Sequence, residues 1–129
     1  MMKYVWILLL GLGSAWLEAS EVTKKMRDME YSMNLMQKGF FYNDKAQITK
    51  GLKEFSQAYG EFKKYNVFDY LKTSQSMEEN IVLNTLKRDE ENIQALQEAL
   101  QKNKILKAAE IHAEILHSCT VCHAITRGW

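Results

Sequence analysis

The 129-residue sequence contains no proline, and only six of its residues are glycine. Because proline removes a backbone donor and bends or breaks a helix, a chain without it can form long uninterrupted helices. Neither sign of charge is in excess, since the formal net charge is +1. A charge so close to zero gives no indication of nucleic acid or an anionic membrane as a partner. The length is that of one compact domain.

Cysteine is scarce as well, with Cys119 and Cys122 as the only two. A disulfide that closed so short a loop would restrain the unfolded chain little, because the stabilisation grows with loop length. Stability is therefore a weak reason for this pair, and the spacing favours a chemical role.

Residues 1–19 differ from the rest of the chain. Lys3 precedes an almost wholly apolar run over residues 4–16, and small residues such as Ala19 follow it as candidate cleavage positions. The run is shorter than the roughly 20 residues that a membrane-spanning helix needs. This pattern is typical of a secretory signal peptide and predicts an exported, periplasmic domain over residues 20–129. An uncleaved N-terminal anchor is the alternative.

Apolar residues recur at three- and four-residue steps in four segments of the remaining chain, which predicts four helices. Asp89 interrupts the apolar stripe of the third segment. Helices of similar length with short connections favour an all-α, antiparallel up-down-up-down four-helix bundle. The predicted helices run from about Ser20 to Lys38, from just after Asp44 to near Tyr65, from Ser76 through Leu100, and from near Asn103 to Arg127.

Polar residues and glycines mark the expected helix ends. Gly39 is predicted to cap the first helix at its C-terminus, and Gly128 lies just beyond the last. Asn43 and Asp44 are both good N-caps for the second helix. Ser76 and Glu79 have the spacing of a capping box at the start of the third.

The string Cys119-Thr120-Val121-Cys122-His123 is the decisive feature. Two thiols at this spacing can add to the two vinyl groups of a haem, and the histidine after the second thiol then binds the iron as proximal ligand. The motif predicts one covalently attached haem c. Because this attachment is completed outside the cytoplasm, the predicted signal peptide and the motif support each other.

Three other interpretations of the motif stay open. A thioredoxin-type redox pair normally lies at a helix start, where the thiol pKa is lowered, whereas this pair is predicted at the end of the last helix. A zinc site could combine the motif with His112 or His117, although three adjacent ligands on one helix would strain a tetrahedral site. The third is a plain structural bundle in which the motif is incidental.

A haem-attachment motif near the C-terminus of an all-helical chain resembles the class II c-type cytochromes, meaning cytochrome c-prime and its low-spin relatives. The resemblance is sharpest over residues 107–127. In that family the motif is commonly followed by two residues, an aromatic and an arginine. Arg127 is at the arginine position, whereas Thr126 replaces the aromatic. The resemblance implies a haem-side contact for Arg127, which would otherwise complement the helix macrodipole. It also implies a homodimer through the first helices as one expected assembly.

The sixth ligand of the iron is expected from the first helix. The starts of antiparallel first and last helices lie at opposite ends of a bundle, so the start of the first lies beside the end of the last. Met26 or Met29 is then level with His123, whereas Met36 is about 15 Å further along the axis than Met26. The resemblance favours Met26, because low-spin members use a methionine early in the first helix. Met29 and an open distal site are the alternatives.

Four other side chains near these positions have simpler expected roles. Lys24 and Lys25 are possible donors that we expect to be solvated, since an ammonium must lose its proton to bind iron. His112 lies about 16 Å from His123 along the same helix, so it cannot reach the same iron. We expect a partly buried, hydrogen-bonded His112 within the bundle and a His117 that faces a neighbour or solvent.

The sequence therefore predicts a one-electron carrier that exchanges electrons with redox partner proteins, and not an enzyme. The processed protein is expected to bind neither nucleic acid nor membrane. The alternative is a gas-binding cytochrome c-prime, in which an open distal site takes nitric oxide or carbon monoxide.

Overall fold

The computed structural model describes the backbone of residues 3–128 and the side chains of residues 21–128. Over these residues the chain is all-helical and contains no strand, which confirms the predicted fold class at this level. The four main helices are α1 (Lys3–Phe41), α2 (Lys45–Phe62), α3 (Glu79–Gln101) and α4 (Ile105–Arg127). Two short 3-10 helices, η1 (Val67–Asp69) and η2 (Thr73–Glu78), connect α2 to α3.

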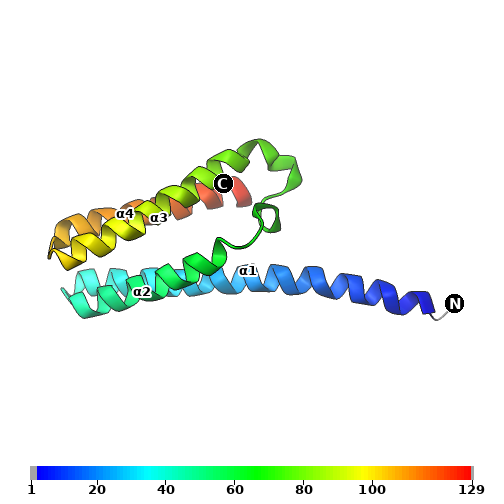
Figure 1. The fold of residues 1–129 in the computed structure, drawn as a ribbon, viewed down its shortest axis with the longest axis horizontal. Helices are drawn as coiled ribbons and strands as arrows, with labels where there is room; N and C mark the ends of the chain where they lie inside the picture. The colour runs from blue at the N-terminus through cyan, green and yellow to red at the C-terminus, as the bar shows by residue number, and fades with distance from the viewer. Residues whose placement is uncertain (1–2, 129) are drawn as a thin grey trace.

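The helices form two pairs, each joined by a short turn. The N-terminal hairpin consists of α1 and α2, and the C-terminal hairpin consists of α3 and α4; packing is much closer within each hairpin than between them. Figure 1 shows that the hairpins approach each other at the end that carries the two turns and diverge toward the C-terminus. Buried side chains of all four helices nevertheless form one hydrophobic core. The divergence matters because a cavity lies between the hairpins beside the end of α4.

The turn between α1 and α2 is built differently from the prediction. Gly39 is not a C-terminal cap, because α1 continues through it to Phe41. A Cβ atom at position 39 would lie only 2.6 Å from Cγ1 of Ile48, so this glycine allows α2 to approach closely. Asn43 takes the left-handed conformation, with φ of 52°. Of the two predicted N-caps, Asp44 is the one that forms, since its carboxylate accepts a hydrogen bond from the following helix.

The turn between α3 and α4 has the same kind of asparagine as the turn between α1 and α2. Asn103 has φ of 54° and precedes α4 as Asn43 precedes α2. The Lys45 ammonium donates a hydrogen bond to Oδ1 of Asn103, which ties the two turns together. Asparagine tolerates the left-handed region better than most residues. The two hairpins are thus joined at their narrow end by polar as well as apolar contacts.

The connection over residues 63–78 departs from the prediction at both ends. α2 ends at Phe62 instead of near Tyr65, and α3 begins at Glu79, so the expected capping box with Ser76 does not form. Ser76 lies instead within η2. The Tyr70 ring packs 5.0 Å from that of Phe62 and covers the core.

The C-terminal end of α4 is held in two ways. Gly128 has φ of 70° and its N–H bonds to the Ala124 carbonyl, which confirms the predicted glycine at this end. The side-chain amide of Gln75 in η2 donates to the Ile125 carbonyl at 2.6 Å. Because the last carbonyls of a helix lack partners within it, both contacts stabilise this turn.

Residues 1–19, the predicted signal peptide, lie outside the residues whose side chains are described. α1 extends past the end of α2 in that direction (Figure 1). Within the described part of the chain, no helix combines the length and the apolar character needed to cross a membrane.

Candidate functional site

The three chemical groups of the motif lie on the last turns of α4. Cys119 and His123 are four residues apart and Cys122 lies between them, so all three project from one side of the helix. Cys122 is 9% exposed, whereas Cys119 and His123 are half-buried. Both cysteines are free thiols. The helix therefore presents two sulfur atoms and one imidazole together.

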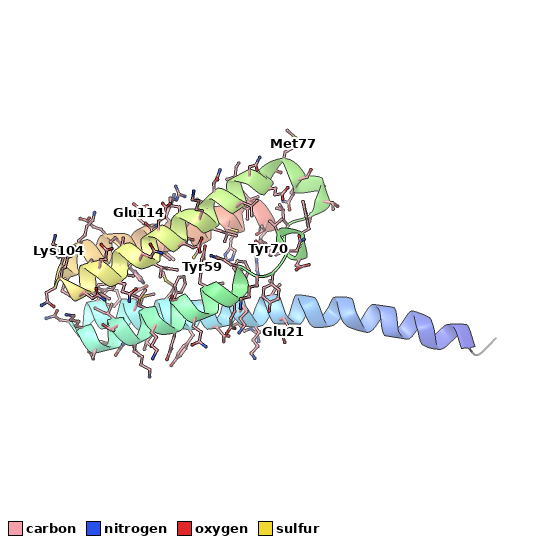
Figure 2. All side chains as sticks on the ribbon, viewed as in Figure 1. Glu21, Tyr59, Tyr70, Met77, Lys104 and Glu114 are labelled. Carbon is pink, nitrogen blue, oxygen red and sulfur yellow. The ribbon has the colours of Figure 1, made fainter. Side chains whose placement is uncertain are left out.

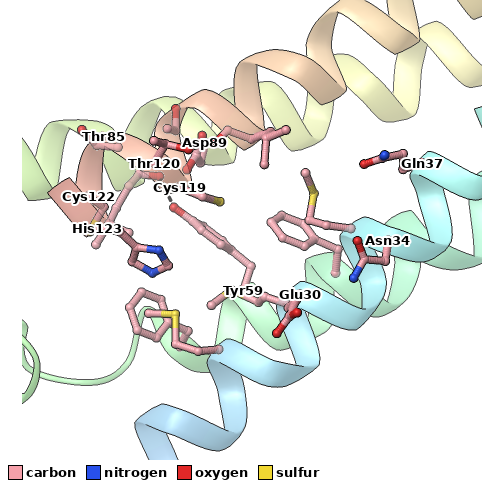
Figure 3. Close-up of a pocket in the computed structure, with 18 residues that line it drawn as sticks. Glu30, Asn34, Gln37, Tyr59, Thr85, Asp89, Cys119, Thr120, Cys122 and His123 are labelled. Atoms are coloured by element: carbon pink, nitrogen blue, oxygen red, sulfur yellow. Dashed lines mark hydrogen bonds between the residues drawn. The ribbon is translucent and has the colours of Figure 1, made fainter. Parts of the chain in front are cut away.

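These groups line a cavity of about 250 Å³ between the two hairpins, which with its open mouth comprises about 1020 Å³. All four main helices contribute to its wall, which consists mostly of apolar side chains. Figure 2 shows Tyr59 extending from α2 toward the C-terminal hairpin, and its hydroxyl donates to the Leu86 carbonyl at 2.5 Å. In Figure 3, His123 and Cys119 of α4 face the same space as this tyrosine. The cavity is thus the site toward which the motif is directed.

The methionines of α1 form the wall opposite the motif. Met26 and Met29, which the sequence placed level with His123, both line this cavity. Met33, one further turn along α1, lines it too. Met36 does not, and its fully buried side chain approaches Gly51 of α2. The structure therefore brings the two candidate ligands and the motif together at one site.

Arg127 does not line the cavity and is exposed at the end of α4. It acts on the site through its charge. Burial lowers the pKa of His123 below its usual value of 6.5, and the positive charge of Arg127 lowers that pKa further. The imidazole is consequently neutral at pH 7, which is the form that binds metals.

The two thiols are not activated. Burial raises the pKa of Cys119 to about 12, and the nearby carboxylate of Asp89 contributes to the rise. The pKa of Cys122 is raised for the same two reasons. A thioredoxin-type pair requires a lowered pKa, because the thiolate is the nucleophile. The environment of these cysteines does not favour that interpretation.

Asp89 is a component of the site whose role the sequence did not reveal. It lies in α3 on the cavity wall and is only 3% exposed. Burial raises its pKa to about 6, although hydrogen bonding with Ser118 and Asn92 and the charge of Arg88 oppose the rise. Its Oδ1 atom is buried without a hydrogen-bond partner. The only signal in the sequence was a polar residue within the apolar stripe of the third helix.

The remaining candidates do not line the cavity. His112 is buried, and its Nε2 lies 3.3 Å from the Met33 carbonyl, which confirms the predicted hydrogen bond within the bundle. His117 is exposed, as is Lys24. Lys25 differs from the expectation of simple solvation, because it forms an ion pair with Glu61 of α2 that raises the pKa of Lys25.

Among the described residues, no group of three or more His, Cys, Asp or Glu side chains is gathered so that it could hold a metal ion. Comparison with models of known protein families, with curated proteins and with solved structures finds no match to this chain. The site must therefore be interpreted from its own chemistry.

Proposed function

We propose that this protein is a periplasmic, monohaem c-type cytochrome that carries single electrons between redox partner proteins. In this proposal the chain is an up-down-up-down bundle of the class II type. Cys119 and Cys122 hold haem c through thioethers, His123 binds the iron as proximal ligand, and Met26 binds it from the opposite side. The observation that carries the proposal is the convergence of the motif and the α1 methionines on one largely apolar cavity.

The residues of the cavity fit a covalently held haem. Each thiol can add across one vinyl double bond, so that the sulfur bonds to one carbon and the thiol proton goes to the other. No oxidant is needed, and two cysteines three residues apart match two vinyl groups. The neutral imidazole of His123 is a suitable iron ligand. The thioether of Met26 or Met29 faces the same space from α1.

The bound haem would supply a centre that gains and loses one electron. The chain would contribute ligands, exclusion of water and a rigid frame. Phe55 and Phe62 of α2 and Leu86 of α3 line the cavity and would cover an apolar ring. Thioether ligation favours the reduced state and raises the reduction potential. These contributions suit electron transfer and need no catalytic side chain.

Expression in the periplasm, together with a working haem-ligation apparatus, tests the proposal. The purified protein should be coloured, and its haem should remain with the chain on a denaturing gel, because only covalent haem survives denaturation. The double variant Cys119→Ala/Cys122→Ala is the matched control and should lose this signal. Colourless wild-type protein that is folded and helical by circular dichroism would rule the proposal out.

A further inference from the structure

The carboxyl group of Asp89 has no function in haem attachment or iron ligation, yet it is buried in the wall of the cavity. Burying a carboxyl group costs free energy unless it is paired or protonated. The Oδ1 atom of Asp89 has no hydrogen-bond partner, and the described residues that line the cavity include no Lys or Arg. A carboxyl group held in this way is best accommodated when it carries a proton.

The other groups packed around Asp89 are engaged in other ways, so the Asp89 carboxyl group is the one that can change its charge inside the cavity. From α2, Tyr59 already donates its hydroxyl proton to the Leu86 carbonyl. From α4, Cys119 and Cys122 would no longer titrate as thioethers, and His123 would be bound to iron. From α3, the positive charge of Arg88 lowers the pKa of Asp89.

One other acidic side chain faces the cavity. Glu30 of α1 lines it but is exposed to solvent. Water screens the charge of such a group, so that charge affects the cavity interior weakly. Figure 3 shows the two carboxyl groups on different helices of the site, with Asp89 on the same side as Cys119 and Glu30 across from it. Glu30 therefore serves as a natural control.

We propose that Asp89 is a redox-linked proton site, which takes up one proton from solvent when the protein accepts one electron from a donor protein. This inference rests on the proposed function. A carboxylate beside the cavity stabilises the oxidised protein, which carries one more positive charge. Gain of the electron removes that attraction, so the carboxylate binds a proton at a higher pH than before. Charge balances because one electron and one proton enter together and both leave on oxidation.

The environment sets the pH range in which this coupling should be observed. Burial raises the pKa of Asp89 from 3.8 to about 6. The reduced protein should bind the proton more tightly than the oxidised one, so the two states differ most near neutral pH. In that range the potential should fall as the pH rises, by at most about 59 mV for each tenfold change in proton concentration.

Spectroelectrochemical titration of the intact haem protein from about pH 5 to about pH 8 tests the proposal. We expect the midpoint potential of the wild type to fall across this range. In Asp89→Asn it should be nearly independent of pH, and at the alkaline end higher than in the wild type. Glu30→Gln removes a carboxylate from the same cavity and should keep the wild-type slope.

Ser118→Ala provides a second test that keeps the carboxyl group in place. Hydrogen bonding with Ser118 lowers the pKa of Asp89, so its loss should move the sloping range to higher pH. Proton uptake on reduction, followed with an indicator dye in weak buffer, should approach one proton per electron in the wild type and vanish in Asp89→Asn.

The possible failures are distinguishable. A coloured protein whose slope persists in Asp89→Asn would assign the proton to another group, such as the haem carboxylates, and would overturn this inference alone. A flat potential in the wild type would do the same. Folded protein without covalent haem would overturn both this inference and the proposed function.

Discussion

The Nε2 atom of His112 in α4 lies 3.3 Å from the carbonyl oxygen of Met33 in α1, so one side chain joins the two hairpins directly. The His112 ring also lies 5.4 Å from that of Phe40. Since a carbonyl can only accept, Nε2 carries the proton of this hydrogen bond. The neighbouring part of α1 lines the cavity, so the contact also helps to set its width.

The first prediction concerns the stability of this contact in acid. Burial lowers the pKa of His112 below 6.5 in the folded protein, so the unfolded chain binds a proton more readily. The stability that neutral His112 contributes is therefore present above pH 6.5 and lost as the pH falls below it. We expect His112→Gln, which can still donate to the Met33 carbonyl, to lose less stability than the wild type as the pH falls. Urea unfolding at about pH 7.5 and about pH 5.5 measures the effect.

Asp89 must be controlled in this experiment, because its raised pKa acts with the opposite sign. The folded protein holds the Asp89 proton more tightly than the unfolded chain, so Asp89 favours folding at low pH. The protein with His112 and the His112→Gln variant should therefore be compared in an Asp89→Asn background. Equal acid sensitivity of the two proteins would show that His112 is not the responsible group.

A second prediction compares two glycines of α2. A Cβ at Gly51 would lie 2.9 Å from the backbone nitrogen of Met36 and 3.0 Å from the Ser32 carbonyl oxygen, neither of which can move independently of its helix. We expect Gly51→Ala to lower the free energy of unfolding by about 1–3 kcal/mol. Gly60→Ala is the control, because nothing lies within 4 Å of its Cβ position.

Gly60→Ala should be neutral or raise stability by up to about 1 kcal/mol, since alanine reduces the entropy of the unfolded chain. Urea denaturation of both variants measures the difference. Equal effects at the two positions would contradict the close approach of α1 and α2 at Gly51.

The features that the sequence predicted correctly are those determined by local chemistry. Asp44 bonds to a backbone amide three residues away, and Gly128 follows the last helical turn, so neither depends on distant residues. Gly39 was misassigned because its function is to admit the Ile48 side chain of another helix, and no local pattern reports such a contact.

The candidate site was partly predictable for the same reason. Helical spacing and an antiparallel arrangement suffice to place Met26 beside His123, and the structure places both on one cavity. The importance of Asp89 could not be predicted in this way. Its unpaired Oδ1 and raised pKa follow from burial between α3 and α4, which is a property of the folded chain alone.

The third prediction distinguishes the electron carrier from a gas-binding protein. If Met26 closes the coordination of the iron, the reduced wild type should bind carbon monoxide slowly or not at all. Met26→Ala should open the site, bind carbon monoxide rapidly, and lower the reduction potential, because thioether ligation raises it. Stopped-flow absorption after mixing with carbon monoxide measures the difference.

Met29→Ala is the matched control for this experiment, since Met29 lines the same cavity and lies less than one turn away. It should leave the absorption spectrum close to that of the wild type. Rapid carbon monoxide binding by the wild type would favour the open-site alternative, and an opened site in Met29→Ala alone would transfer the ligand role to Met29.

The last prediction tests how the end of α4 is held in place beside the motif. The side-chain N–H of Gln75 donates to the Ile125 carbonyl, and the side-chain oxygen of Gln75 accepts from the backbone N–H of Lys72. Gln75→Glu should preserve the second contact, but it replaces the donor with a negative charge at the negative end of a helix. We expect a loss of about 1–2 kcal/mol in the free energy of unfolding at pH 7.

The loss should diminish at about pH 4, where the new carboxyl group takes up a proton and can donate again. Ser74→Glu adds the same charge at an exposed position of η2 and should have a much smaller effect. Amide hydrogen exchange should locate the change, with faster exchange in the last turn of α4 and unchanged rates near the turn at Asn103. If exchange instead changed by the same factor along the whole of α4, Gln75 would not hold this end specifically. The contacts around His123 would then depend on packing alone.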